Sequence, residues 1–147
     1  MTVDEGEGRL GELFMRLARR THVLQVERLT PLGLTPAQAR ALSVLGRCDQ
    51  PPRMAELAER LGVVPRAVTP IVDALEEAGL VRRRIDPHNR RSTLLELTDE
   101  GTAMRTRMYQ ARVGAAEDLF ASLTAEQRQT LLALLEQADA ATASHRH

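Results

Sequence analysis

The sequence has few aromatic residues and no lysine, and both absences limit what the chain can build. Aromatic residues make up 2% of the 147 residues, whereas hydrophobic residues in all make up 43%. Leucine, valine and alanine must therefore fill the core. All twenty basic residues are arginine, whose planar fork suits phosphates and guanine edges. The length fits one ordinary domain, or one small domain with helical extensions.

Cysteine is nearly absent, and long apolar runs are missing. Cys48 is the single cysteine, so no intrachain disulfide can form and a reducing compartment is the natural setting. No stretch approaches the ~20 apolar residues that a membrane span requires. The acidic segment 1–8 lacks the basic start and apolar run of a signal peptide. We therefore expect a cytoplasmic protein without membrane contact.

The sequence contains no group of residues with the spacing that is typical of a catalytic site or a metal site. There is no Ser/His/Asp set, no phosphate-binding glycine loop and no paired-carboxylate arrangement. The histidines show no metal-ligand spacing with Cys, Asp or Glu; they are His22, His88, His145 and His147. We expect no enzyme activity, no bound metal and no cofactor.

The centre of the chain has the pattern of a helix-turn-helix followed by a hairpin. Residues 54–61 predict a short amphipathic helix, and Gly62 lies in the turn that follows. Pro65 then stands where a first helical residue would, because its missing N–H is not needed there. Apolar residues recur at helical spacing from Val68 to Ala78, and Gly79 ends that helix. The second helix of such a pair enters the major groove of DNA.

The spacing of the apolar residues changes after Gly79 from a helical pattern to a strand pattern. Residues 81–85 and 93–97 predict two strands, joined by turn residues from Asp86 to Arg91. This makes a winged helix. The segment 82–91 contains five arginines and one carboxylate, on a chain of zero formal net charge. Such a local basic footprint indicates contact with a polyanion. The alternative for the second helix is that it is only the core helix of a small helical domain.

Further helices are predicted on both sides of the winged helix. They span residues 9–29, 35–46, 98–121 and 125–141, and residues 140–147 are expected to fray. Thr35 and Thr124 each begin a Thr-x-x-Gln capping box. The sequence therefore predicts a mainly α protein with a small β-hairpin wing. Residues 34–97 form the DNA-binding domain, and residues 9–31 with 98–141 form a helical region.

The leucine faces of the terminal helices are too wide for one small domain to cover. Two arrangements account for them, a homodimer interface built from both ends of the chain or an intrachain helical bundle. We favour the dimer, because helix-turn-helix proteins usually bind two half-sites symmetrically.

Candidate DNA contacts lie on the second helix and on the wing. Arg66, Ala67, Thr69 and Pro70 lie off the apolar stripe near the start of the helix, where base edges would be met. A phosphate contact is the alternative for Arg66. Arg90 and Arg91 are expected to contact the groove or the backbone, and a solvated hairpin is the alternative. The other wing candidates are Arg84, His88 and Asn89. Asp73 and Glu76 are expected to face away from DNA or to pair with neighbouring arginines such as Arg82 or Arg83.

The order of elements resembles the MarR (multiple antibiotic resistance regulator) family over nearly all of residues 9–141. The most specific stretches are MAELAERLG at 54–62, VTPIVDALEEAGL at 68–80, and Leu97-Thr98-Asp99-Glu100-Gly101. The last is similar to the Leu-Thr-x-x-Gly of the family. The resemblance implies a homodimeric winged-helix regulator, usually a repressor on a pseudo-palindromic operator in double-stranded DNA. It also implies release by a small aromatic or anionic effector. His22 lies on the first helix near the expected ligand crevice and is a pocket candidate, and a plain helix-surface histidine is the alternative.

Two positions depart from the family pattern. Asn89-Arg90-Arg91 stands where the family commonly has Asp-Arg-Arg, and Asp86 is the carboxylate that could substitute. Pro70 occurs inside the recognition helix, so this helix either begins later than Pro65 or is kinked. These departures support one alternative function, a winged-helix module that contacts proteins and does not read DNA. We interpret Cys48 as having no redox role, since it lies outside the first helix, where the resembling peroxide sensors keep their cysteine.

Overall fold

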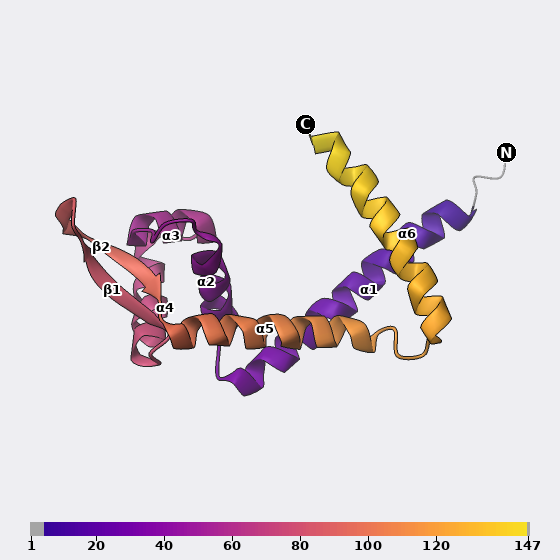
Figure 1. The fold of residues 1–147 in the computed structure, drawn as a ribbon, viewed down its shortest axis with the longest axis horizontal. Coiled ribbons are helices and arrows are strands. Elements are labelled where there is room, and N and C mark those ends of the chain that lie inside the picture. Colours follow the sequence, from indigo (N-terminus) through magenta and orange to yellow (C-terminus); the bar gives the residue numbers. More distant parts are fainter. Residues whose placement is uncertain (1–4, 147) are drawn as a thin grey trace.

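The computed structural model describes residues 5–146, which are mainly helical with one antiparallel hairpin (Figure 1). The fold class predicted from the sequence is confirmed. The elements before the wing are α1 (Glu5–Leu29), η1 (Thr30–Leu32), α2 (Pro36–Arg47), α3 (Met54–Leu61) and α4 (Pro65–Glu77). The wing and the helices after it are β1 (Val81–Asp86), β2 (Asn89–Leu97), α5 (Asp99–Asp118), α6 (Ala125–Ala143) and η2 (Ser144–Arg146).

The helix boundaries follow the capping residues. Thr35 and Thr124 both form complete capping boxes with the glutamine three residues on. Thr98 caps α5 by accepting a hydrogen bond from the amide of Gly101. Three ends differ from prediction. α1 begins earlier, at Glu5, and α5 ends earlier, at Asp118 instead of residue 121. α6 continues to Ala143 and into η2 instead of fraying from residue 140. Residue 147 lies outside the described residues.

The helix-turn-helix consists of α3 and α4, joined by a turn at Gly62. Gly62 has a φ of +69°, a left-handed conformation that favours glycine, and its amide closes the end of α3. Leu57, Ala58 and Leu61 bury the inner face of α3. The same turn therefore ends one helix and directs the chain into the next.

The hairpin is longer than the sequence predicted. Only Pro87 and His88 lie outside the strands at its tip, so Asn89, Arg90 and Arg91 belong to β2 and not to a loop. The register pairs Val81 with Leu97 and shifts irregularly between Ile85 and Asp86. The strand prediction was wrong here because the polar residues at 89–92 lack apolar alternation, although backbone pairing needs none.

The core lies inside the winged helix and extends into α5. Its largest fully buried side chains include Leu42 of α2, Leu57 of α3, Leu75 of α4 and Leu95 of β2. Met108 of α5 is buried against the same cluster. The winged helix and the first half of α5 therefore share one core.

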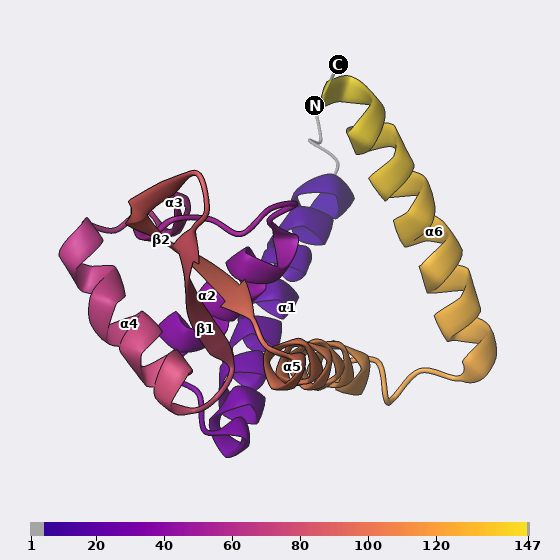
Figure 2. The ribbon, with the colours of Figure 1, turned by 60° about the vertical axis from the view of Figure 1, so that its left-hand side comes forward.

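The molecule is elongated, with the winged helix at one end and α6 at the other (Figure 1). α5 runs between these ends and packs along α1. Turning the view shows α6 standing apart from the other helices, attached through the loop after α5 (Figure 2). Apart from η2, which continues it, no described element packs extensively on α6. Leu132, Leu134 and Leu135 of α6 are accordingly exposed.

Candidate nucleic-acid interface

The recognition helix α4 has a buried face and an outward face. Val68, Val72 and Leu75 are buried in the core. Arg66 and Pro70 lie one helical turn apart on the opposite side, and both are exposed. The helix begins at Pro65, so the predicted alternative of a later start is wrong, and Pro70 lies inside the helix. A proline there provides no amide N–H for the carbonyl of Arg66.

Arg83 joins the hairpin to the second half of α4. Its guanidinium donates to Asp73 at 2.6 Å and to Glu76 at 2.8 Å, and its amide donates to Glu76 at 3.3 Å. The hydrogen bond to Asp73 is the main reason that the pKa of Arg83 is raised, against the opposing effect of burial. The expectation that both acids pair with a neighbouring arginine is confirmed. The charges of Asp73 and Glu76 on this helix are thus neutralised in part.

Two further wing arginines share one carboxylate. Glu96 of β2 forms an ion pair with Arg84 at 2.9 Å and a second one with the Nε of Arg82 at 3.4 Å. The side chain of Glu96 is 18% exposed, whereas that of Arg84 is 52% exposed. Arg84 is therefore accessible, but part of its charge is compensated within the hairpin.

Asp86 fixes the tip of the wing to the loop before α3. It is 5% exposed and accepts from the amide of His88 at 2.9 Å and from Arg53 at 2.9 Å. These two hydrogen bonds, the one from His88 first, hold the pKa of Asp86 below its ordinary value. The backbone of Arg53 also bridges to Leu94. Asp86 consequently does not replace the missing wing carboxylate at position 89, because it holds Arg53 instead.

The cations at the wing tip are those without an acidic partner. Arg90 and Arg91 are exposed and form no ion pair with any residue between 5 and 146, and the same holds for Arg66. Asn89 accepts a hydrogen bond from the amide of Arg91 at 3.2 Å. The five wing arginines are thus unequal. Three of them are paired with carboxylates, whereas Arg90 and Arg91 at the tip have no acidic partner in the described chain.

Sequence reasoning missed Arg53 and Glu96. Arg53 precedes a helix as an ordinary loop residue, and only the tertiary fold brings it to Asp86, which lies 33 positions away. Glu96 left a usable signal. Strand alternation puts residues 82, 84 and 96 on one face of a paired hairpin. The predicted strands 81–85 and 93–97 already place Arg82 opposite Glu96, so this ion pair could have been predicted.

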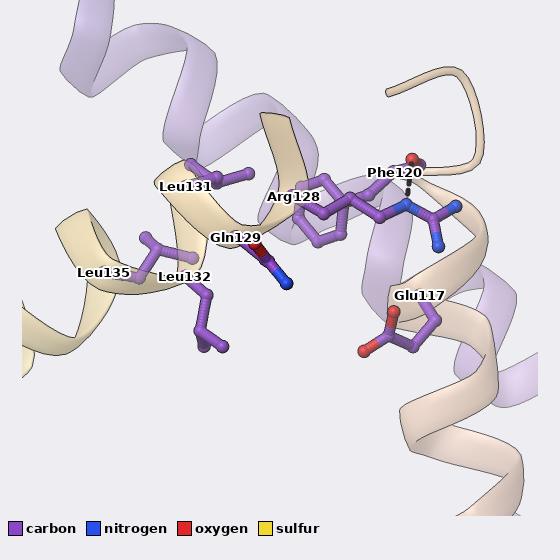
Figure 3. Close-up of a pocket in the computed structure, with 7 residues that line it drawn as sticks. All are labelled: Glu117, Phe120, Arg128, Gln129, Leu131, Leu132 and Leu135. Carbon is purple, nitrogen blue, oxygen red and sulfur yellow. Dashed lines mark hydrogen bonds between the residues drawn. The ribbon is translucent and has the colours of Figure 1, made fainter. Parts of the chain in front are cut away.

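The far end of the molecule contains an apolar cleft of about 270 Å³ between the end of α5 and α6 (Figure 3). Leu131, Leu132 and Leu135 line one side, and Phe120 and Glu117 lie on the other. Gln129 and Arg128 complete the lining, and Arg128 donates to the carbonyl of Phe120 at 3.1 Å. On α1, the exposed apolar residues include Leu10, Phe14 and Met15.

The remaining candidates occupy ordinary positions. His22 is exposed on α1. Cys48 follows α2 directly, is half-buried, and donates from its thiol to the carbonyl of Val44 at 3.3 Å. Within residues 5–146, no three His, Cys, Asp or Glu side chains are grouped as metal ligands. None of the described helices combines the length and the apolar character needed to cross a membrane.

Several known proteins are similar to this chain. The transcriptional repressor Rv2887 of Mycobacterium tuberculosis is 34% identical over 110 residues, which are 74% of this chain and 77% of Rv2887. The repressor MdtR of Bacillus subtilis is 40% identical over 76 residues, 52% of this chain, and the match spans about half of MdtR, 48%. The solved structure of the repressor CouR, bound to a 23-mer DNA duplex, has a TM-score of 0.62 at 31% identity. It covers 95% of this chain and 98% of the CouR chain.

The fold and these relatives define the class as winged helix-turn-helix transcriptional regulators that bind DNA. Residues 34–93 match the sequence model of one such family. The chain belongs to the MarR family, as its sequence pattern predicted.

Proposed function

We propose that the chain is a repressor that binds a pseudo-palindromic operator as a homodimer and leaves it when a small ligand binds. One observation carries the proposal. Arg66, Arg90 and Arg91 have no acidic partner in the described chain, and they lie on the two elements, α4 and the wing, that share one end of the molecule. An arginine near the N-terminal end of a recognition helix suits guanine edges, and arginines on a wing suit the backbone or the minor groove.

In this proposal, the recognition helix contributes Arg66, Ala67, Thr69 and Pro70 to the major groove. The wing contributes Arg90 and Arg91, while His88 and Asn89 shape its tip. Arg84 joins them only if a phosphate replaces Glu96 as its partner. Residues 34–97 are then the DNA-binding domain. The similarity to CouR, whose solved structure is bound to a 23-mer DNA duplex, supports this arrangement.

Residues 9–31 and 98–141 form the dimerisation region in this proposal. The exposed leucines of α6, the cleft in Figure 3 and the apolar residues of α1 lie at the end away from the wing. A monomer rarely exposes so many apolar side chains together. A second copy related by a twofold axis would cover both helices with the same surfaces. The intrachain bundle finds no support, because α6 lies apart from α1 and α5 (Figure 2).

The ligand is proposed to be a small aromatic or anionic molecule, with His22 as a contact. The family resemblance supports this part, together with the exposed imidazole of His22 on α1. Titrating small aromatic acids into the protein–DNA complex tests it, with His22→Ala as the variant. Release of wild-type protein but not of the variant is the expected result.

Selection of bound DNA from a random pool tests the operator. The expected product is a pseudo-palindrome with half-site centres about 10 bp apart, and one asymmetric footprint would contradict it. For the dimer, sedimentation should show a monomer after deletion of residues 125–147. The double variant Leu132→Glu/Leu135→Glu should give the same result with its helix content intact. Thr130→Glu, at an exposed polar position of the same helix, is the matched control and should remain a dimer.

A further inference from the structure

The start of the recognition helix presents an exposed apolar surface. Val64 is 63% exposed and Val63 is 38% exposed in the turn that leads into α4. Ala67 is half-buried and Pro70 is exposed on the first two turns of the helix. We call these four residues the α4 patch. Val64, Ala67 and Pro70 follow at three-residue intervals, so the patch runs along one side of the helix start.

Hydrogen-bonding side chains are few beside the α4 patch. From Gly62 to Gly79 the sequence contains no asparagine or glutamine, the side chains that bind adenine with two hydrogen bonds. Asp73 is engaged by Arg83 at 2.6 Å. Arg66 therefore provides the one guanidinium fork on this helix, and Thr69 provides a hydroxyl and a methyl group. A surface of this kind distinguishes base pairs mainly by apolar contact.

In the major groove, thymine is the base that carries an apolar group, the C5-methyl. The groove edge of guanine instead offers the two acceptors that fit an arginine fork. We propose that the recognition helix reads thymine C5-methyl groups through the α4 patch, next to one guanine read by Arg66 in each half-site. This inference rests on the proposed operator binding and names what distinguishes the operator from other DNA.

Pro70 is the residue that argues most strongly for this reading. It is exposed, so its ring contributes nothing to the core. A proline within a helix removes a hydrogen bond and destabilises that helix. Its ring does place three carbons on the outward face directly above Arg66. The residue therefore costs the fold stability while enlarging the surface that would meet a methyl group.

Charge complementarity identifies DNA as the occupant of this surface. The α4 patch is flanked by the cation of Arg66, and the unpaired cations Arg90 and Arg91 lie on the neighbouring wing. An apolar protein partner would gain nothing from three uncompensated arginines around its binding site. A DNA groove combines the two requirements, since its floor carries methyl groups and its rims carry phosphates.

Replacing thymine by deoxyuridine tests the inference, because uracil lacks only the C5-methyl group. The duplex is the sequence selected from the random pool, with thymines replaced one pair of symmetric positions at a time. Loss of one buried methyl contact should weaken binding about fourfold, or about fifteenfold when both half-sites of the dimer lose it. Thymines outside the half-sites serve as the control positions, and their replacement should leave affinity unchanged.

Protein variants connect the effect to the α4 patch. Val64→Thr keeps the shape of the side chain but replaces one methyl group with a hydroxyl, and Pro70→Ala removes most of the ring. Both should reduce the difference between thymine and uracil duplexes. Pro70→Ala should also raise Tm, because it restores an amide N–H within α4. Arg90→Ala is the matched control and should weaken binding to both duplexes by the same factor.

Equal binding of the thymine and uracil duplexes would overturn the inference and leave operator binding intact. A uracil effect that persists unchanged in Val64→Thr and Pro70→Ala would overturn it too, since the methyl groups would then be read elsewhere. Failure to bind any duplex would instead remove the proposed function, and this inference with it.

Discussion

Gly101 at the start of α5 is the position where one added carbon should damage the fold most. A Cβ atom at Gly101 would overlap the backbone carbonyl oxygen of Leu80, which cannot rotate away as a side chain would. That same carbonyl accepts a hydrogen bond from the amide of Thr98 at 3.1 Å. Thr98 in turn caps α5 and donates to the carbonyl of Gly79 at 2.6 Å. Gly101→Ala must therefore displace either the helix start or the turn after α4.

The expected decrease in the free energy of unfolding follows from these contacts. Overpacking against backbone costs about 1–3 kcal/mol, and a disturbed helix cap costs about 1 kcal/mol. Replacing glycine with alanine inside a helix returns about 0.5–1 kcal/mol. The net destabilisation is about 2 kcal/mol, which lowers Tm by about 4–8 °C for a chain of this size.

Thermal unfolding followed by circular dichroism, at equal protein concentrations, measures this effect. Gly11→Ala is the control, since Gly11 also lies within a helix and an added Cβ there meets no atom within 4 Å. It should gain about 0.5–1 kcal/mol from helix propensity alone. If Gly101→Ala melted together with Gly11→Ala, the packing of α5 on Leu80 would not be the constraint described here.

Three further predictions concern charged residues of the wing. Arg91→Ala should weaken binding to all duplexes alike and make the dependence of log K on log salt shallower by about one per lost contact; isotherms with an unchanged slope would show that the wing tip does not touch DNA. Arg83→Ala leaves Asp73 and Glu76 uncompensated, so affinity should fall more at low salt than at high salt, and an equal loss at both would contradict this. The pKa of Asp86 is depressed in the folded chain. Its carboxylate therefore stabilises the fold at pH values above its ordinary pKa of about 3.9. This stabilisation is lost as the pH falls through the lower pKa of the folded chain. Asp86→Asn should thus lower Tm at pH 7, with the gap to wild type closing below about pH 4, whereas parallel curves from pH 7 to 3 would refute it.

The helices could be predicted from the sequence because their signals are local. Thr35 and Thr124 satisfy their own capping boxes within four residues, and Pro65 and Gly62 have conformations that depend little on distant contacts. Local signals of this kind can be recognised in the sequence without knowledge of the tertiary structure. They were enough to predict the helix-turn-helix, its wing and the family.

The electrostatics of the interface could not be predicted in the same way. The sequence shows five arginines close together in the wing, but their partners come from other elements or from the opposite strand. Arg83 forms an ion pair with Asp73 of α4, and Asp86 forms one with Arg53 in the loop before α3. A count of charges treats all five as equal, whereas the fold leaves only Arg90 and Arg91 uncompensated. Glu96, which pairs from the opposite strand with Arg82 and Arg84, was overlooked for the same reason.

The unbroken length of α5 has a mechanical consequence. Its 20 residues form a rod of about 30 Å at 1.5 Å per residue. One end is wedged against Leu80 through Gly101, and the other is tied to α1 by the ion pair between Arg28 and Asp118 and by Gln25, which donates to the carbonyl of Arg112 at 3.3 Å. A tilt of about 5° at the tied end moves the wedged end by about 2.5 Å over that length. In the proposed dimer, α5 would therefore act as a lever, through which small rearrangements beside α1 change the separation of the two wings.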